Sequence, residues 1–440
     1  MKESIFNIYY TADDGARLAF NSLTCALAVI DESYDKLINN LNSINKNSIP
    51  KELNDCFNAA YNGHFIVEDD IDELKELSIK RNFSKYSIES LGLTIAPTLA
   101  CNFKCIYCYE TSKPGMMSEK TRTQLIEFVR SQMTSIKSLD ISWYGGEPLL
   151  AKDIIYSLSE EFIGLCQQHG IEYNAYMISN GSLLDDSTIQ KLEEYKVRGI
   201  QITLDGPPKI HDNRRICKSG DGSFDTIIDR INRILLTSKI DVSIRINLDR
   251  TNSNCLEELL KILSERLVSK DVRISFGQVT ASTEACRSIE SSCYNNKEFA
   301  LEVVNYYPLL VKYGFDNLNK FPYPRLTLNY CCAELLNSFV VDPEGYLYKC
   351  WNEVGNHNRS VGNISDGHYD ITHKKNATWV ERNPIEYKKC SECALLPVCM
   401  GGCPHNDIIL KKGCVCDMIK FNNKEIMLNY YNEFIKNQEL

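Results

Sequence analysis

The chain has 440 residues, 43% of them hydrophobic, and a formal net charge of −9. This length is enough for two or three domains, and the acidic balance argues against a nucleic-acid partner, which normally meets a basic surface. No stretch reaches the roughly 18 apolar residues of a membrane-spanning helix, and the start of the chain lacks the apolar core of a signal peptide. We therefore expect a cytoplasmic protein that binds neither nucleic acid nor membrane.

The first part of the chain, residues 1–88, predicts a short β region followed by helices. Strand-forming segments flank a turn at Asp13, Asp14 and Gly15, and acidic residues stand at the starts of the helical segments. The predicted strands are Ile5–Tyr10, Arg17–Ile30 and His64–Val67, and the predicted helices are Asp31–Leu41, Pro50–Tyr61 and Asp70–Lys80.

Residues 91 to about 315 alternate strand and helix patterns in a regular way. This alternation predicts an α/β fold with a parallel sheet, open or partly closed into a barrel. In such folds the chemistry lies on loops that follow the carboxyl ends of the strands. The predicted strands are Leu91–Ala96, Leu139–Tyr144, Tyr173–Ile178, Gly199–Leu204, Val242–Leu248 and Val272–Val279, and the predicted helices are Glu119–Gln132, Asp153–Gln168, Ser187–Lys196, Phe224–Leu236 and Leu256–Glu265.

The last part, residues 325–440, has little periodicity and is rich in Cys, Gly and Asn, as expected for loops around metal centres. The whole chain holds 19 cysteines, which in a reducing compartment indicate metal binding or catalysis rather than disulfides. Twelve of them fall in two tight groups. We interpret the seven scattered cysteines as small buried side chains; they are Cys25, Cys56, Cys166, Cys217, Cys255, Cys286 and Cys293.

The first group follows the first strand of the alternating part with CxxxCxxC spacing. Cys101, Cys105 and Cys108 bring three thiolates into one short loop, and thiolates select iron–sulfur clusters or zinc. A four-iron cube held by three cysteines keeps one iron open to a small molecule. A structural zinc site is the alternative, but zinc needs a fourth ligand nearby, and Tyr107 and Tyr109 do not serve. The spacing therefore predicts a catalytic iron–sulfur cluster.

This loop, with Tyr107 before its last cysteine, resembles the radical S-adenosylmethionine (radical SAM) superfamily. Gly-Gly-Glu-Pro at 145–148 follows the second predicted strand, where the family's GGEP motif binds the methionine amino group of the cosubstrate. The third predicted strand ends at Ser179 and Asn180, where related enzymes place a hydroxyl near the ribose; a plain turn is the alternative. By this resemblance SAM is held by Tyr107, Gly145, Gly146, Glu147, Pro148, Ser179, Asn180, Asp205 and Arg215.

The resemblance assigns the methionine carboxylate to Arg215, because a guanidinium suits bidentate binding of a carboxylate. Arg214 is the alternative if the register shifts by one, and Arg245 and Asn247 on the fifth strand have either a site role or a structural one. The three cysteines of the loop then hold a catalytic [4Fe–4S] cluster. An electron from a donor such as flavodoxin or ferredoxin cleaves SAM there to a 5′-deoxyadenosyl radical.

The second cysteine group resembles the SPASM extension, which holds two auxiliary iron–sulfur clusters in peptide-modifying members of the superfamily. Twelve residues separate Cys332 from Gly345, four more precede Cys350, and a C-x2-C-x5-C-x3-C run begins at Cys390. Two zinc ribbons are the alternative. The resemblance implies two clusters, expected as [4Fe–4S], with Cys332, Cys350 and Cys403 in the first and Cys390, Cys393, Cys399 and either Cys416 or Cys414 in the second.

Two departures from this pattern bear on the chemistry. Related enzymes often have a further cysteine at the position of Leu326, so either Cys331 fills the gap or the first auxiliary cluster keeps an open iron for a substrate thiolate. Sulfatase-maturing members have an aspartate base directly after the cysteine that matches Cys350, and here that position is Trp351. We therefore favour thioether formation over formylglycine formation.

Residues 1–88 resemble the winged-helix domains that bind the leader peptides of ribosomally made natural products. A DNA-binding winged helix and a dimerisation element are the alternatives. The segment carries nine Lys and Arg against fourteen Asp and Glu, which argues against DNA. Leader-binding domains capture the peptide by strand addition, in which backbone hydrogen bonds give affinity and side pockets give selectivity.

Together these patterns predict a three-domain peptide maturase. A leader-peptide recognition domain occupies 1–88, a radical SAM partial (β/α)6 barrel 89–320, and an auxiliary-cluster domain 321–440. We expect the enzyme to form an intramolecular thioether crosslink in a cysteine-containing precursor peptide. A carbon–carbon crosslink, epimerisation and formylglycine formation are alternatives with the same cofactors. A zinc-stabilised peptide-binding module is the non-enzymatic alternative, and zinc in place of iron would identify it.

Overall fold

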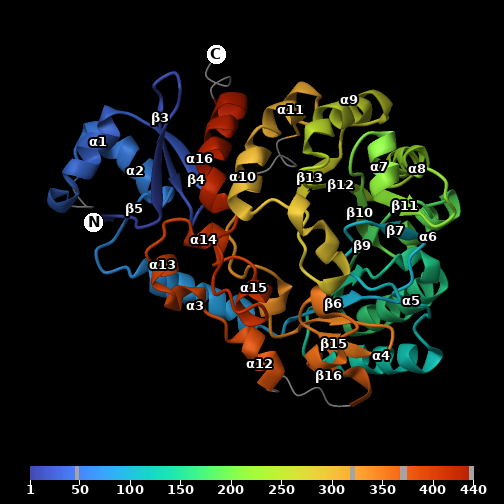
Figure 1. Cartoon of the computed structure of the whole chain (residues 1–440). Helices are drawn as coiled ribbons and strands as arrows, with labels where there is room; N and C mark the ends of the chain where they lie inside the picture. Colours follow the sequence, from blue (N-terminus) through green and yellow to red (C-terminus); the bar gives the residue numbers. More distant parts are fainter. Residues whose placement is uncertain (45–48, 318–322, 367–373, 436–440) are drawn as a thin grey trace. The chain divides into compact units, whose positions relative to one another are not determined.

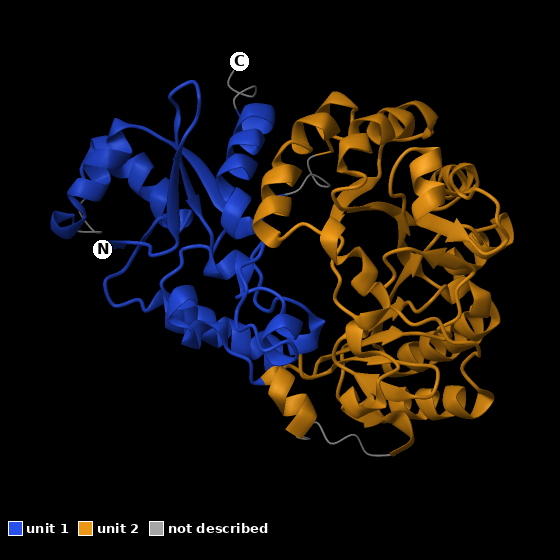
Figure 2. Cartoon of the chain, viewed as in Figure 1, with its two compact units in different colours: residues 1–86, 322–334, 381–440 blue, residues 87–321, 335–380 orange. Residues whose placement is uncertain are grey.

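The computed structural model describes residues 1–44, 49–317, 323–366 and 374–435. The chain forms two compact units (Figure 1, Figure 2). The predicted boundary at 320/321 lies outside the described residues, and the three-domain division stays a prediction. No helix in the described part of the chain has the length and apolar content to cross a bilayer. Unit 1 consists of Met1–Tyr86, Pro322–Glu334 and Glu381–Leu440, and unit 2 of Ser87–Phe321 and Leu335–Val380.

Unit 2 is built on a nine-stranded sheet in the order β13-β12-β10-β9-β8-β6-β14-β15-β16. The six strands from β13 to β6 pair in parallel, which confirms the predicted α/β fold with its parallel sheet. Buried residues alternate with less buried ones along β6 and β12, as a pleated strand requires. These strands are β6 Ser90–Ile95, β8 Ser138–Trp143, β9 Glu172–Ser179, β10 Val197–Thr203, β12 Asp241–Leu248 and β13 Arg273–Gln278.

Helices connect these strands, and all five predicted ones are confirmed to within two residues at each end. In α8, Ile227, Ile231 and Ile234 recur at helical spacing and are fully buried. The side chains of Ser118 and Asp185 cap α4 and α6 by accepting hydrogen bonds from backbone N–H groups of the first turn. The elements are α4 Glu119–Gln132, α5 Lys152–His169, α6 Asp186–Glu194, α7 Pro208–Arg214, α8 Phe224–Thr237, α9 Leu256–Arg266, α10 Asn296–Val304, α11 Tyr307–Lys312, α12 Lys374–Val380, and the short strands β7 Phe103–Cys105 and β11 Arg215–Cys217.

Three strands from beyond residue 335 extend this sheet, and no pattern in the sequence predicted them. β14 (Ser338–Val341) pairs in parallel with β6, and all four of its residues are buried. β15 (Tyr346–Tyr348) and β16 (Gly362–Asn363) follow as antiparallel neighbours. Strands this short carry too few residues for a recognisable alternation. The segment that leads to Cys350 is thereby joined to the same sheet as the first cysteine loop.

The N-terminal part of unit 1 contains a three-stranded antiparallel sheet and three helices, in the predicted order of strands and then helices. The predicted strand Arg17–Ile30 is two strands, because residues 22–25 form a turn in which Cys25 has a φ of 58°. Tyr34 and Leu37 of α1 lie in the hydrophobic core that this part shares. The elements are β1 Lys2–Glu3, β2 Asn7–Thr11, β3 Arg17–Asn21, β4 Ala26–Ile30, β5 Ile66–Val67, α1 Glu32–Asn39, α2 Asn54–Asn62 and α3 Glu73–Tyr86.

The C-terminal segments of unit 1 pack on these N-terminal elements. Tyr10 of β2 donates a hydrogen bond to the side chain of Asn423 in α16 at 2.7 Å. Leu77 of α3 lies in one hydrophobic cluster with Cys390 and Cys414. The cysteine-rich segment therefore shares a core with the N-terminal helices. Its helices are α13 Lys388–Ser391, α14 Leu396–Cys399, α15 Pro404–Ile408 and α16 Ile419–Tyr430.

Lys85 of α3 should make the stability of the protein depend on pH. The side chain is 2% exposed, and burial, assisted by nearby Arg81, lowers its pKa from 10.5 to about 8. Between about pH 8 and pH 10.5 Lys85 is therefore protonated in the unfolded chain but largely neutral in the native one. The free energy of unfolding consequently increases as the pH rises through this range. We expect Lys85→Met to raise the free energy of unfolding by about 1–3 kcal/mol at pH 7 and by less at pH 10.

Urea denaturation at both pH values measures this effect. Lys120→Met, which changes an exposed lysine of α4, is the control and should change stability little at either pH. An equal gain from Lys85→Met at pH 7 and pH 10 would contradict the role assigned to burial of the charge.

Candidate active site

The loop after β6 carries the three cysteines of the CxxxCxxC motif. Its middle strand, β7, pairs antiparallel with β11, so that Cys105 lies opposite Arg215. Burial raises the pKa of Cys101 to about 11 and that of Cys108 to about 12, and both thiols lie within electrostatic reach of Cys105. Burial also raises the pKa of Cys105, while the Arg215 guanidinium opposes the rise. The structure thus gathers three thiols in one loop, with Arg215 and Arg214 within electrostatic reach of Cys105.

The donor set of this loop fits an iron–sulfur cluster. Thiols are soft ligands, and three of them suit a cube that keeps one iron open. Among the described Cys, His, Asp and Glu side chains, no group of three is arranged to hold a metal ion. The loop therefore supplies ligands of the right kind, and their arrangement around a cluster stays a prediction.

The Gly-Gly-Glu-Pro motif lies against the start of the cysteine loop. A Cβ atom on Gly145 would lie 2.3 Å from the carbonyl oxygen of Thr98, and one on Gly146 would lie 2.3 Å from that of Ala100. Gly145 also has a φ of 117°. Both positions require glycine, because a side chain would push the cysteine loop away. The motif therefore sets how closely the end of β8 approaches the loop.

Glu147 is fully buried and fixes the end of the neighbouring strand. Its carboxylate accepts hydrogen bonds from the Ser179 hydroxyl at 2.9 Å and from the backbone N–H of Asn180 at 2.7 Å. Burial raises the pKa of Glu147, and these hydrogen bonds oppose the rise. The Asn180 side chain donates to Asn102 of the cysteine loop at 2.8 Å. Pro148, the last residue of the motif, is buried and opens a short 3-10 helix.

Asn102 is a residue of this site that no motif indicated. It also donates a hydrogen bond to the Ser182 hydroxyl at 3.0 Å, so it connects the cysteine loop to the loop after β9. A single asparagine between two cysteines has no distinguishing pattern in the sequence, and its role becomes visible only when the two loops are brought together.

Tyr107 is the centre of a second network. Its hydroxyl donates to the Asp205 carboxylate and accepts hydrogen bonds from Arg215 at 2.7 Å and from Asn247 at 3.3 Å. Asp205 is fully buried, which raises its pKa, and Arg215 opposes the rise. Burial alone would lower the pKa of Arg215, but the surrounding acidic groups, Cys105 first among them, raise it well above its usual value. The guanidinium therefore stays charged and suits an anionic ligand such as a carboxylate.

Arg214 and Arg215 have different partners. Arg214 is 4% exposed, pairs with Asp249 at 2.9 Å and donates a hydrogen bond to Thr251 at 2.7 Å. Both guanidinium groups lie beside Tyr107: Arg214 lies 5.3 Å from the centroid of its ring, and Arg215 donates to its hydroxyl and lies opposite Cys105 of the cysteine loop. The Nη atoms of Arg214 are thus committed to a buried ion pair, and the geometry favours Arg215 as the residue that meets the cosubstrate.

The two arginines should respond differently to replacement. We expect Arg214→Gln to lower the free energy of unfolding by about 3–5 kcal/mol, because Asp249 is left buried without its cation. We expect Arg215→Gln to weaken SAM binding about 10- to 100-fold, the loss of one hydrogen-bonded charge contact. Urea denaturation and calorimetric titration of the reconstituted enzyme with SAM measure the two effects. The reverse assignment of these effects would support the shifted register.

The second cysteine group is distributed over both units. Cys332 and Cys403 belong to unit 1 and Cys350 belongs to unit 2, so the ligand set of the first auxiliary cluster stays a prediction. Both Cys414 and Cys416 lie near Cys390, which leaves the choice between them open. Within unit 1, Cys390 lies within electrostatic reach of Cys393, Cys414 and Cys416, and Cys399 lies within reach of Cys416.

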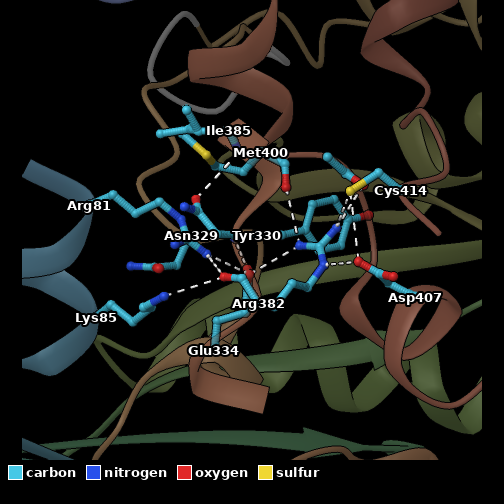
Figure 3. A network of polar contacts seen from close by, with 12 residues as sticks. Arg81, Lys85, Asn329, Tyr330, Glu334, Arg382, Ile385, Met400, Asp407 and Cys414 are labelled. Atoms are coloured by element: carbon cyan, nitrogen blue, oxygen red, sulfur yellow. Dashed lines mark hydrogen bonds and ion pairs between the residues drawn. The ribbon is translucent and has the colours of Figure 1, made fainter. Parts of the chain in front are cut away.

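Arg382 is the centre of a network of polar contacts within this cysteine segment (Figure 3). Its buried guanidinium donates to the carboxylates of Glu334 at 3.0 Å and of Asp407 at 2.9 Å. It also donates to the carbonyl oxygen of Gly401 at 2.9 Å and to the sulfur of Cys414 at 3.4 Å. Gly401 lies between the third and fourth cysteines of the run. One cation thus connects two parts of the cysteine segment, and no motif in the sequence indicated it.

Three similarities to known proteins bear on this site. The cysteine-type anaerobic sulfatase-maturating enzyme of Clostridium novyi is 22% identical over 346 residues, which cover 72% of this chain and 89% of that protein. The fold is similar to that of native anSMEcpe with bound AdoMet and Cp18Cys peptide, with a TM-score of 0.61 and 20% identity over 79% of this chain and 99% of that one. It is also similar to Streptococcus suis SuiB bound to precursor peptide SuiA, with a TM-score of 0.50 and 15% identity over 91% and 95% of the two chains.

The fold and the site place the protein in one class of α/β enzymes. In this class a three-cysteine loop follows the first strand of a parallel sheet, and a glycine motif follows the second. Residues 95–263 match the family model of the radical SAM superfamily. The chain therefore contains a radical SAM domain, which confirms the predicted resemblance and the predicted class of enzyme. Members of this family use SAM and a [4Fe–4S] cluster, and Cys101, Cys105 and Cys108 are the residues here that would hold the cluster.

Proposed function

We propose that this protein is a peptide maturase that forms a thioether between a cysteine sulfur and a carbon atom of a precursor peptide. The observation that carries the proposal is a second cysteine group in the same chain as the three-thiol radical site, gathered around Cys390 in unit 1. A radical enzyme that only moves a hydrogen atom needs no further redox group. An oxidative crosslink leaves an electron behind, and auxiliary iron–sulfur clusters suit the role of acceptor.

When bound, SAM and the cluster supply a 5′-deoxyadenosyl radical that removes hydrogen from a carbon atom. The residues of the chain bind and orient the cosubstrate. Arg215 offers a charged guanidinium, and its hydrogen bond to Tyr107 keeps that guanidinium aimed at the site. Glu147 presents a buried carboxylate to the methionine ammonium group while it fixes the end of β9 through Ser179.

The crosslink balances as follows. Formation of one sulfur–carbon bond removes from the peptide a thiol proton, a hydrogen atom and one electron. The hydrogen atom would leave to the 5′-deoxyadenosyl radical that SAM supplies, and the proton to water. The electron would leave to an auxiliary cluster held by the cysteines around Cys390. A donor such as flavodoxin or ferredoxin supplies the separate electron that starts each turnover.

Two observations support a peptide substrate. The relative from Clostridium novyi is a sulfatase-maturating enzyme, and the two similar structures contain bound peptides, Cp18Cys in anSMEcpe and precursor peptide SuiA in SuiB. The structural similarity to SuiB covers 91% of this chain, whereas residues 89–440 make up only about four fifths of it. The similarity therefore includes part of the first 88 residues. We assign leader-peptide capture to this N-terminal part, by strand addition to β2 or β4, the outer strands of its sheet.

Mass spectrometry tests the proposal. The enzyme is reconstituted with iron and sulfide without oxygen and incubated with reductant, SAM and a cysteine-containing precursor peptide encoded beside its gene. We expect the peptide to lose two hydrogens and one alkylatable thiol. Loss of two hydrogens with every thiol still free would indicate a carbon–carbon crosslink and contradict the thioether. An unchanged mass together with inverted residues would indicate epimerisation.

Formylglycine formation is a second candidate because of the sulfatase-maturating relative. It predicts a different product, in which a cysteine loses its sulfur and becomes an aldehyde. The same mass spectrum separates the two, and the aldehyde reacts with a hydrazide probe whereas the thioether does not.

A further inference from the structure

Unit 2 contains one exposed tryptophan beside the candidate active site. Trp351 directly follows Cys350, and 42% of its surface is exposed. The other two tryptophans of the chain, Trp143 and Trp379, are 0% and 5% exposed. An isolated exposed apolar side chain needs no explanation, so the neighbours of Trp351 decide whether it forms part of a site.

The indole of Trp351 stacks on the ring of Tyr144. Their ring centroids are 5.7 Å apart and their planes meet at 29°. Tyr144 is 8% exposed and immediately precedes the Gly-Gly-Glu-Pro motif, and its backbone N–H donates to the carbonyl oxygen of Ile95 at 2.9 Å. The exposed ring therefore rests on a residue that the sheet holds in place.

The segment after Trp351 is also attached to the catalytic loop. The Lys113 ammonium donates a hydrogen bond to the carbonyl oxygen of Gly355 at 3.3 Å. A Cβ atom on Gly355 would lie 3.9 Å from the Leu99 side chain, so the two loops touch there. The Tyr144 ring, which supports Trp351, lies within electrostatic reach of Cys108. Trp351 is thus held beside the three-cysteine loop, and much of its ring stays exposed.

We infer that Trp351 and Tyr144 form an aromatic platform that binds an apolar or aromatic side chain of the peptide next to the residue that is modified. Trp351 is then a specificity-determining residue and Tyr144 its positioning residue. An exposed indole face gains free energy by covering apolar surface and by stacking, and it offers little to a carboxylate. This inference rests on the proposed function only in taking a peptide as the ligand, and it holds whichever bond the enzyme forms.

The fluorescence of Trp351 allows a test that needs no turnover, because the other two tryptophans are buried. The probes are the acetylated tripeptide amides Gly-Phe-Gly, Gly-Leu-Gly and Gly-Asp-Gly, added to the reconstituted enzyme with SAM. We expect the first two to shield the tryptophan emission from quenching by acrylamide, and the aspartate probe to shield it at least severalfold less at equal concentration. Equal shielding by all three probes, or none by any, would overturn the inference.

Variants identify the residue that causes the difference. Equilibrium dialysis of labelled Gly-Phe-Gly amide should show about tenfold weaker binding to Trp351→Ala, about 1.4 kcal/mol, and nearly unchanged binding to Trp351→Phe. Tyr176→Ala removes another exposed aromatic ring of the same sheet and should have no effect. Unchanged binding to Trp351→Ala would exclude the platform even if the enzyme makes a thioether. Selective binding without a thioether product would keep the platform and reject the proposed reaction.

Discussion

Replacement of Cys105 by alanine is expected to abolish formation of 5′-deoxyadenosine while the chain stays folded. Cys105 lies opposite Arg215 in the β7–β11 pair and within electrostatic reach of both other thiols of its loop. Removal of one thiol leaves two, which is too few to hold a cube with an open iron. The reconstituted variant should therefore lose about four irons per chain and the electron paramagnetic resonance signal that SAM perturbs.

Cys217→Ala is the matched control for this variant. Cys217 lies on the partner strand β11, opposite Phe103, and its sulfur contacts the backbone of Asn102. We expect it to retain its iron and its rate of SAM cleavage, because it is one of the scattered cysteines. Full iron content in Cys105→Ala, or bound zinc in the unaltered protein, would contradict the catalytic cluster and favour the zinc-stabilised module.

Replacement of Arg382 by glutamine is expected to lower the free energy of unfolding by about 3–5 kcal/mol and to reduce the iron held by the second cysteine group. The guanidinium makes five hydrogen bonds, among them those to Glu334, Asp407 and the sulfur of Cys414. Glutamine leaves the buried carboxylate of Glu334 and the partly buried one of Asp407 with one cation fewer, and desolvation of an unpaired charge is costly. It also releases Gly401 and Cys414 from a common partner, so the cysteines are less well held for cluster assembly.

Two further variants interpret this result: one separates the charge of Arg382 from its geometry, and the other is a control at an exposed ion pair. Arg382→Lys keeps the charge but loses the planar fork of donors, and should recover part of the stability. Arg233→Gln breaks an exposed ion pair with Asp186 and should change the free energy of unfolding little. Urea denaturation measures the free energy of unfolding of each variant, and iron analysis measures the iron that its second cysteine group holds. A cost for Arg382→Gln as small as that for Arg233→Gln would contradict the role assigned to the buried network.

The sequence predicted the long elements of unit 2 well because each carries its own periodicity. The isoleucines of α8, for example, mark a helix without reference to the rest of the chain. β7, β11 and β14 have three or four residues each and form only because a distant partner supplies the hydrogen bonds. Their existence is a property of the tertiary structure, and local pattern therefore failed to indicate them.

The candidate site was predictable to the extent that its chemistry lies in short motifs. The cysteine loop and Gly-Gly-Glu-Pro are contiguous in sequence, so the ligands and the glycines were recognisable there. The choice between Arg214 and Arg215 was not, because the two are adjacent and only their distant partners distinguish them, Asp249 for Arg214 and the Tyr107 hydroxyl for Arg215. The sequence did not indicate Arg382 either, because its role depends on Glu334, which lies 48 residues away along the chain.

The position of β14 has a consequence for how the protein is made. Ser338 pairs beside Gly92, so the last partner of β6 leaves the ribosome nearly 250 residues after β6 itself. Until then β6, with buried Leu91 and Leu93, presents unpaired backbone that invites pairing with another chain. A fragment that stops at residue 320 would keep that exposure permanently. We therefore expect such a fragment to aggregate more readily than the whole chain, because β6 would lack the partner that covers this edge.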